Sequence, residues 1–144
     1  MRVSLTSWQV WAFLSAAFAA LTAVLAKAGV ANLNSDLATF IRTIVVVGVS
    51  AALLTALGEW QPPASIPLRT YGLLAASGLA TGASWLCYFR AMKLGNAAQV
   101  AAVDKLSVVL VALIATLFLG ERLSPANWAG VALMAAGGML VALR

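Results

Sequence analysis

Two adjacent charged residues, Asp104 and Lys105, lie near the middle of an otherwise apolar stretch from Ala97 to Leu119. Ionisable groups inside a membrane span are rare and costly, and they often mark substrate pathways or proton relays. Successive residues of a helix point about 100° apart, so we expect these two to reach different helices. Arg42 is the expected partner of Asp104, with Arg90 as the second choice. Two interpretations stay open: a structural ion pair that fixes helix packing, or a group that contacts substrate or exchanges protons.

Aromatic and hydroxyl side chains form a second candidate group. Four hydroxyls recur at helical spacing on one face of the stretch from 68 to 92, namely Ser77, Thr81, Ser84 and Tyr88. Trp85 lies beside them and could present its ring face to a cation or an apolar solute, as could Tyr88. Trp11 in the first stretch could line the same cavity or face lipid. We therefore predict a cavity lined by Trp11, Thr81, Ser84, Trp85 and Tyr88.

Small residues suggest where helices pack closely. Gly78 and Gly82 form a GxxxG pair, and the last stretch carries Gly130, Gly137 and Gly138 without any internal charge. Such positions let helix backbones approach closely in lipid. We expect them to mediate helix packing or a dimer seam.

The composition requires a bilayer around these residues. The 144 residues are 63% hydrophobic and 9% charged, with a mean hydropathy of +1.00, whereas a soluble domain has roughly a quarter charged residues. Five apolar runs are long enough for the ~20 residues of a membrane helix. The prediction is a single all-α integral membrane domain, residues 1–144, with spans at about 8–27, 37–57, 68–92, 97–119 and 125–143.

Several functions are disfavoured by what the sequence lacks. It has no histidine and one cysteine, Cys87, so we expect no disulfide, no metal site, no cofactor and no enzyme activity. The formal net charge is +5, but the basic residues are scattered singly and mostly fall at span ends. We interpret them as lipid-headgroup anchors and expect no nucleic-acid partner.

Local signals place two helix starts. Ser35 and Asp36 predict a side-chain cap and a first-turn acid for the second span, and Ser124 followed by Pro125 predicts a capped start for the fifth. The connection from Gly58 to Pro63 is expected to be a water-exposed turn without catalytic content.

The basic residues give no firm instruction about orientation. On one side of the membrane we count three basic residues, Arg2, Arg69 and Arg122, and on the other side four, Lys27, Arg90, Lys93 and Arg144. The α-amino group adds a positive charge to the first side and levels the balance. Both orientations are therefore open to the chain.

Three segments together resemble the EamA repeat of the drug/metabolite transporter superfamily. They are WLCYFRAMKLG at 85–95, LFLGERL at 117–123 and WAGVAL at 128–133, and Lys27 and Arg42 also sit where that repeat places basic residues. Many members carry a proline near Ser107, and this chain has none there. The resemblance covers essentially the whole chain.

The resemblance implies half of a transporter. Members commonly hold two five-helix repeats in inverted orientation and export small metabolites, amino acids or drugs. We therefore expect a multi-pass protein of a bacterial-type inner (plasma) membrane that forms an antiparallel, dual-topology homodimer and moves a small solute by alternating access. A membrane scaffold or one half of a heterodimeric transporter are the alternatives. The charge of the solute stays open, because aromatic groups suit a cation and Arg42, Arg90 and Lys105 suit an anion.

Overall fold

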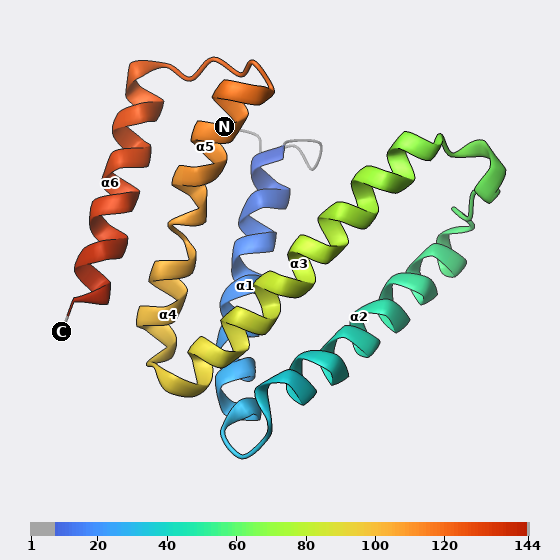
Figure 1. Cartoon of the computed structure of the whole chain (residues 1–144), viewed down its shortest axis with the longest axis horizontal. Coiled ribbons are helices and arrows are strands. Elements are labelled where there is room, and N and C mark those ends of the chain that lie inside the picture. Colours follow the sequence, from blue (N-terminus) through green and yellow to red (C-terminus); the bar gives the residue numbers. More distant parts are fainter. Residues whose placement is uncertain (1–7, 144) are drawn as a thin grey trace. The chain divides into compact units, whose positions relative to one another are not determined.

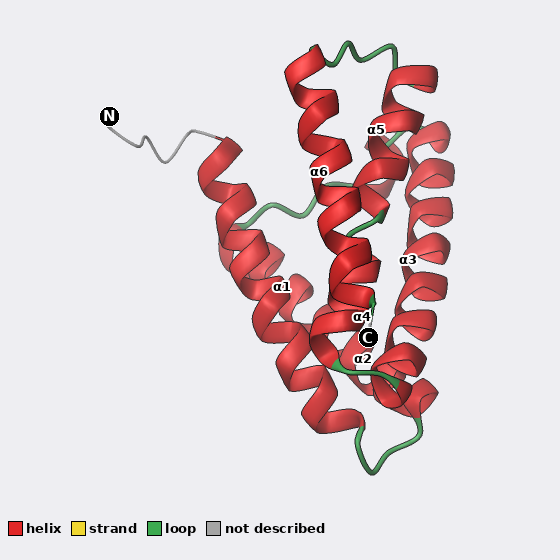
Figure 2. Cartoon of the chain, turned by 90° about the vertical axis from the view of Figure 1, so that its left-hand side faces the viewer, coloured by secondary structure: helices red, strands yellow, loops and turns green. Residues whose placement is uncertain are grey.

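The computed structural model describes residues 8–143, and these residues form helices without any strand (Figures 1 and 2). Arg2 and Arg144, both counted above in the charge balance, lie outside the described residues. In chain order the elements are α1 (Trp8–Val30), α2 (Ser35–Leu57), the short 3₁₀ turn η1 (Pro63–Ser65), α3 (Leu68–Leu94), α4 (Ala97–Asp104), α5 (Ser107–Phe118) and α6 (Pro125–Ala142).

The all-helical fold class is confirmed, because five segments of 18 to 27 residues are long and apolar enough to cross a membrane. At 1.5 Å per residue these lengths correspond to about 27–40 Å, which matches a hydrocarbon core of about 30 Å with some tilt. In the most apolar 18-residue stretch of each span, between 6% and 11% of the residues are buried within the chain. Most of each span's surface is therefore left to lipid or to another protein.

The fourth span is interrupted where the sequence analysis gave one uninterrupted run. Helix α4 ends at Asp104 and α5 begins at Ser107. The N–H of Leu106 donates to the carbonyl of Val103 (3.0 Å), although an unbroken α-helix would direct it to Ala102. The next bonds, from Val108 and Val109, also span three residues and not four. The interruption thus arises from a tightened turn and involves no proline.

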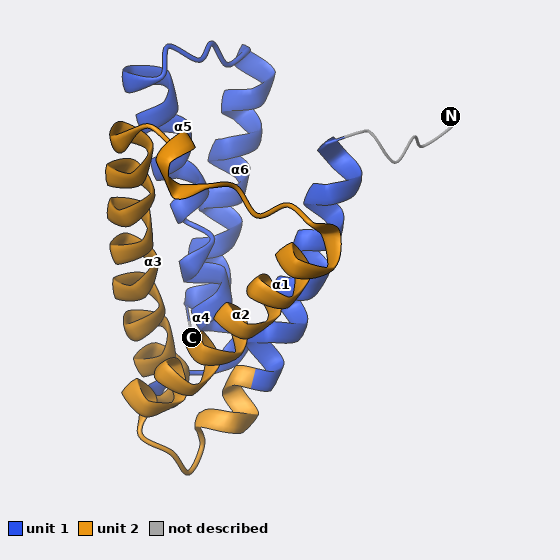
Figure 3. Cartoon of the chain, turned by 90° about the vertical axis from the view of Figure 1, so that its right-hand side faces the viewer, with its two compact units in different colours: residues 1–25, 94–144 blue, residues 26–93 orange. Residues whose placement is uncertain are grey.

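By its internal contacts the chain divides into two compact units (Figure 3). One comprises α1 up to residue 25 together with residues 94–143, and the other comprises residues 26–93. In the first unit α6 packs along both α4 and α5. Gly138 of α6 makes the tightest approach, because a Cβ there would lie 3.1 Å from the carbonyl oxygen of Ala102. This contact falls beside the interruption.

In the second unit the tightest packing gathers where α1 ends, α2 begins and α3 ends. Val30, Thr39, Phe89 and Met92 are each at most 5% exposed. A hydrogen bond also joins the ends of α1 and α3, because Lys27 Nζ donates to the carbonyl of Met92 (2.7 Å). These contacts fix the register of the three helix ends around a small apolar core.

Helix termini follow local rules, with one correction. The cap of α2 is Asn34, one residue before the predicted Ser35, and its Oδ1 accepts from the N–H groups of Asp36 (2.8 Å) and Leu37 (3.1 Å). The Asn34 side chain precedes the helix, so its oxygen can accept from both N–H groups, whereas the Ser35 hydroxyl already lies within the first turn. The predicted cap of α6 is confirmed, since Ser124 Oγ accepts from the N–H of Asn127 (3.2 Å) and a proline follows it.

Candidate functional site

Arg42 of α2 is held against two aromatic rings of α3. Its Cζ lies 4.1 Å from the centroid of the Trp85 ring and 5.7 Å from that of Phe89. The two rings are four residues apart, so they share one face of α3. Stacking of a guanidinium on ring faces contributes about 2 kcal/mol when the group is desolvated. This contact joins α2 and α3 through long side chains.

Three other cations of this unit have partners of their own at the helix ends. Arg90 forms a two-point ion pair with Asp36, from Nε to Oδ1 (3.0 Å) and from Nη2 to Oδ2 (2.8 Å). Lys93 Nζ donates to the carbonyl of Leu33 (2.9 Å), and Lys27 is bound to Met92. Arg90 was the second choice as partner of Asp104, and its carboxylate is Asp36 instead. The reason is position, since both residues lie at the helix ends that share one side of the membrane.

Arg42 differs from these cations in what surrounds its charge. Within its own unit, residues 26–93, the ion pair within 4.0 Å is Arg90 with Asp36, so Arg42 has no carboxylate partner in that unit. Both contacts bring the guanidinium carbon over aromatic rings, which offer no lone pair, whereas a guanidinium carries five N–H donors. The group can therefore donate to an added acceptor.

The remaining predicted residues of α3 lie at varied exposure. Tyr88 is half-buried, and its ring meets Phe89 edge-on with centroids 6.4 Å apart. The Thr81 hydroxyl donates to the carbonyl of Ser77 (2.9 Å), so its proton is committed to its own helix, and Ser84 is exposed. Trp11 is 65% exposed and belongs to the other unit. The cavity lined by all five residues stays a prediction.

Asp104 and Lys105 lie where α4 ends, and they contact each other. Lys105 Nζ is 3.5 Å from Asp104 Oδ2, a long ion pair with both side chains substantially exposed. Sequence reasoning treated them as poor partners on a regular helix. The helix ends between them, and the flexible lysine stem reaches back to the carboxylate. A pairing of Arg42 with Asp104 joins different units and stays a prediction.

The glycines divide into one packed position and several open ones. A Cβ at Gly138 would also lie 3.3 Å from Leu106 Cδ2, so this residue serves packing within the chain. In the described part of the chain no atom lies within 4 Å of a Cβ built at Gly78, Gly82, Gly130 or Gly137. These four keep open faces, on which the predicted dimer seam could form.

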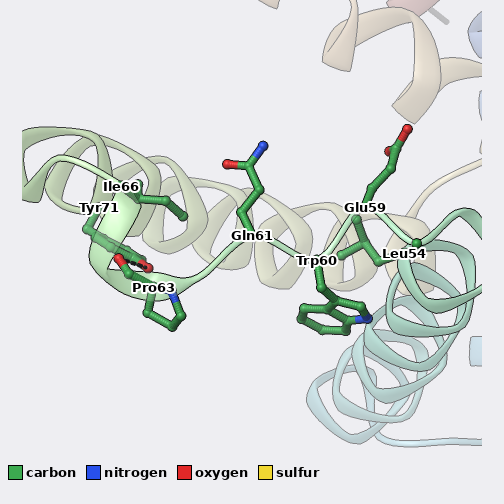
Figure 4. Close-up of a pocket in the computed structure, with 8 residues that line it drawn as sticks. Leu54, Glu59, Trp60, Gln61, Pro63, Ile66 and Tyr71 are labelled. Atoms are coloured by element: carbon green, nitrogen blue, oxygen red, sulfur yellow. Dashed lines mark hydrogen bonds between the residues drawn. The ribbon is translucent and has the colours of Figure 1, made fainter.

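An open groove occurs at the turn between α2 and α3 (Figure 4). It is lined by Leu54, Gly58, Glu59, Trp60, Gln61, Pro63, Ile66 and Tyr71. Local bonds shape it, because the Trp60 indole donates to Thr55 Oγ1 (3.1 Å) and the Tyr71 hydroxyl donates to the carbonyl of Pro63 (3.3 Å). None of the predicted cavity residues lines this groove, and the polar groups of Trp60 and Tyr71 are bonded within the turn.

The sequence pattern of the EamA-like transporter family matches residues 6–143, the stretch that holds all five spans. The chain belongs to the EamA-like transporter family. A relative from Sinorhizobium sp, named "Uncharacterized transporter in cobO 3'region", is 64% identical over 137 residues, which cover 95% of this chain and 97% of that protein. No solved structure matches the chain significantly. The protein is therefore a multi-pass membrane transporter.

For this EamA-family chain, sequence reasoning missed two residues that shape the Arg42 site. Phe89 was not among the predicted cavity residues, although its spacing of four from Trp85 already placed both rings on one helical face. Asp36 was assigned only to the first turn of α2, yet it neutralises Arg90. The signal for that pair was available, because both residues end spans on the same side of the membrane.

Proposed function

We propose that this EamA-family chain works as an antiparallel homodimer that exports a small solute by alternating access. The observation that carries the proposal is the odd number of spans in residues 8–143. Five crossings put the two ends of the repeat on opposite sides of the membrane. Two copies related as inverted repeats must therefore insert in opposite senses.

The distribution of charge supports insertion in both senses. Of the basic residues at span ends in residues 8–143, Arg69 and Arg122 lie on one side and Lys27, Arg90 and Lys93 on the other. Lysine and arginine bias normally sets orientation, and a difference of this size gives weak instruction. The low burial of every span also supports a partner, because a single copy encloses little of its own surface.

Site-directed labelling tests the topology. In a Cys87→Ser background, Gln61→Cys places one thiol in the exposed turn between α2 and α3. A membrane-impermeant maleimide added to intact cells should label about half of the copies if the chain inserts equally both ways. Labelling of all copies, or of none until the cells are opened, contradicts the proposal.

A charge-bias variant provides the functional counterpart. Two lysines added beside Arg2 should shift labelling strongly toward one side and reduce transport, because fewer antiparallel pairs can form. Matched additions of two glutamines should change neither property. Unchanged transport in the lysine variant would indicate a parallel or monomeric unit.

Reconstitution separates a transporter from a membrane scaffold. Solutes are first screened by thermal shift across amino acids, nucleobases and quaternary amines, since a bound solute stabilises the native form. Flux of the best ligand into liposomes should fall in Arg42→Ala, Trp85→Ala and Asp104→Asn while folding is retained. Absence of flux with a constantly copurifying protein favours the scaffold, or a heterodimer if that protein is a second EamA chain.

A further inference from the structure

We infer that the site formed by Arg42, Trp85 and Phe89 binds the anionic group of a small organic acid. The inference gives the solute a negative charge, which the sequence analysis left open. This inference rests on the proposed function and names the substrate class of the same site. The chemistry it invokes is a carboxylate or an oxyanion of similar size. Such a group accepts two parallel N–H bonds from the edge of a guanidinium.

The first step concerns the rings. An aromatic pair in a membrane helix suits a cationic solute when its faces are free. Here Arg42 already occupies the face of Trp85 at 4.1 Å and approaches that of Phe89 at 5.7 Å. A cationic solute would lose the stacking position and would also meet a like charge within a few ångströms. The site therefore disfavours cations.

The second step concerns the charge of Arg42, which no carboxylate of residues 26–93 neutralises. Its Cα lies eight residues into the apolar helix α2, about 10 Å along the axis from the helix start. Asp36 at the start of the same helix is bound by Arg90 through two hydrogen bonds, so it is not available to Arg42. Ring faces stabilise a cation only in part, and its donors still need acceptors. An anionic solute supplies both the charge and the acceptors.

The third step concerns rigidity. Phe89 is 3% exposed and belongs to the small core of its unit, so the ring is held in place. A guanidinium held between the half-buried Trp85 and the buried Phe89 has fewer positions open to it, which reduces the ordering cost of binding. A lysine at position 42 would keep the charge but lose the plane and the fork.

The test uses the full-length protein in nanodiscs and two matched probe sets that differ in charge alone. The aromatic set is benzoate, benzyl alcohol and benzylammonium, and the aliphatic set is hexanoate, hexanol and hexylammonium. Affinities are measured by calorimetry. We expect each carboxylate to bind at least about tenfold more tightly than its ammonium counterpart. Equal binding, preference for the ammonium, or no carboxylate binding at millimolar concentration overturns the inference.

Variants assign the effect to the site. Arg42→Gln should weaken carboxylate binding at least about tenfold, and Arg42→Lys should give a smaller loss because the charge is kept. Arg69→Gln is the matched control, because it removes the same charge from an exposed position at the start of α3. Trp85→Leu should also weaken binding, whereas Trp60→Leu in the exposed turn should not. Carboxylate binding that Arg42→Lys and Arg42→Gln leave unchanged overturns the assignment.

A comparison of two lipid compositions separates a bound solute from a bound lipid headgroup. A lipid headgroup could offer Arg42 the same oxyanion, so nanodiscs of phosphatidylcholine are compared with nanodiscs that also contain phosphatidylglycerol. If Arg42→Gln loses bound phosphatidylglycerol without affecting either carboxylate, the site holds lipid and the solute assignment fails.

Binding is measured without a gradient and independently of topology. Selective carboxylate binding with one-sided Gln61→Cys labelling would therefore refute the dimer alone, and cation binding with two-sided labelling would refute this inference alone.

Discussion

Replacement of Gly138 by alanine probes the contact between α6 and the interrupted fourth span. The new Cβ would lie 3.1 Å from the backbone oxygen of Ala102 and 3.3 Å from Leu106 Cδ2. The leucine side chain can rotate away, but the oxygen belongs to the backbone at the end of α4. Relief of that contact requires α4 and α6 to separate by a few tenths of an ångström.

Two opposing terms set the magnitude. Alanine is favoured over glycine in a helix by up to about 1 kcal/mol, and overpacking of a close contact costs about 1–3 kcal/mol. Gly137 is the matched control, because it is the preceding residue and a Cβ there meets no described atom within 4 Å. The propensity term is common to both variants. Gly138→Ala should therefore be less stable than Gly137→Ala by about 1–3 kcal/mol.

The measurement is reversible unfolding in mixed micelles, followed by circular dichroism while the fraction of sodium dodecyl sulfate is raised. Each variant is measured at several protein concentrations, because Gly137 could also contribute to a dimer seam and only dimer dissociation depends on concentration. Gly130→Ala, another open position, gives a second reference. If Gly138→Ala is as stable as both references, the contact with Ala102 does not restrict α6 and our reasoning is refuted.

Three further predictions concern the ends of α2, and the same unfolding assay measures them. Asp36→Ala should lower the stability slightly, because the two-point bond to Arg90 is exposed to solvent, and the exchange Asp36→Arg with Arg90→Asp should recover part of the loss; no coupling in the double-mutant cycle would count against the pair. Gly58→Ala should cost about 1–2 kcal/mol, because this residue ends the helix at φ +68°, whereas Gly72→Ala at an open helical position should cost nothing; equal stability would refute the left-handed cap. Asn34→Ala should cost about 0.5–2 kcal/mol through loss of two accepted N–H bonds, and Asn34→Ser should restore most of it; a neutral alanine would mean that water replaces the cap.

The spans and one of the two caps were predictable because they depend on local properties. Each apolar run is matched to the bilayer by its own length, without reference to the other runs. Ser124 and Pro125 likewise act within one turn. The shift of the α2 cap from Ser35 to Asn34 stays within the uncertainty of helix ends.

The interruption and the Arg42 site depend on residues far apart in the sequence. Nothing in the residues around Leu106 breaks a helix, and the structure places the close approach of Gly138 beside the break. Trp85 was predicted to present a ring face to a cation or an apolar solute, and Arg42 was predicted to pair with Asp104. The structure places the Arg42 guanidinium over the Trp85 ring, although the two residues are 43 positions apart. Periodicity within one helix could not have told which residue of another helix lies opposite.

The absence of proline from the interrupted span has a consequence for motion. A proline would permanently remove one N–H and hold the bend by covalent geometry. Leu106 retains its N–H, which now donates to Val103, and the α-helical acceptor on Ala102 is one residue away. Straightening this segment would exchange one hydrogen bond for another and break no covalent restraint. The bend in this span is therefore held by hydrogen bonds and by packing against Gly138 of the neighbouring helix, and no covalent restraint opposes its straightening.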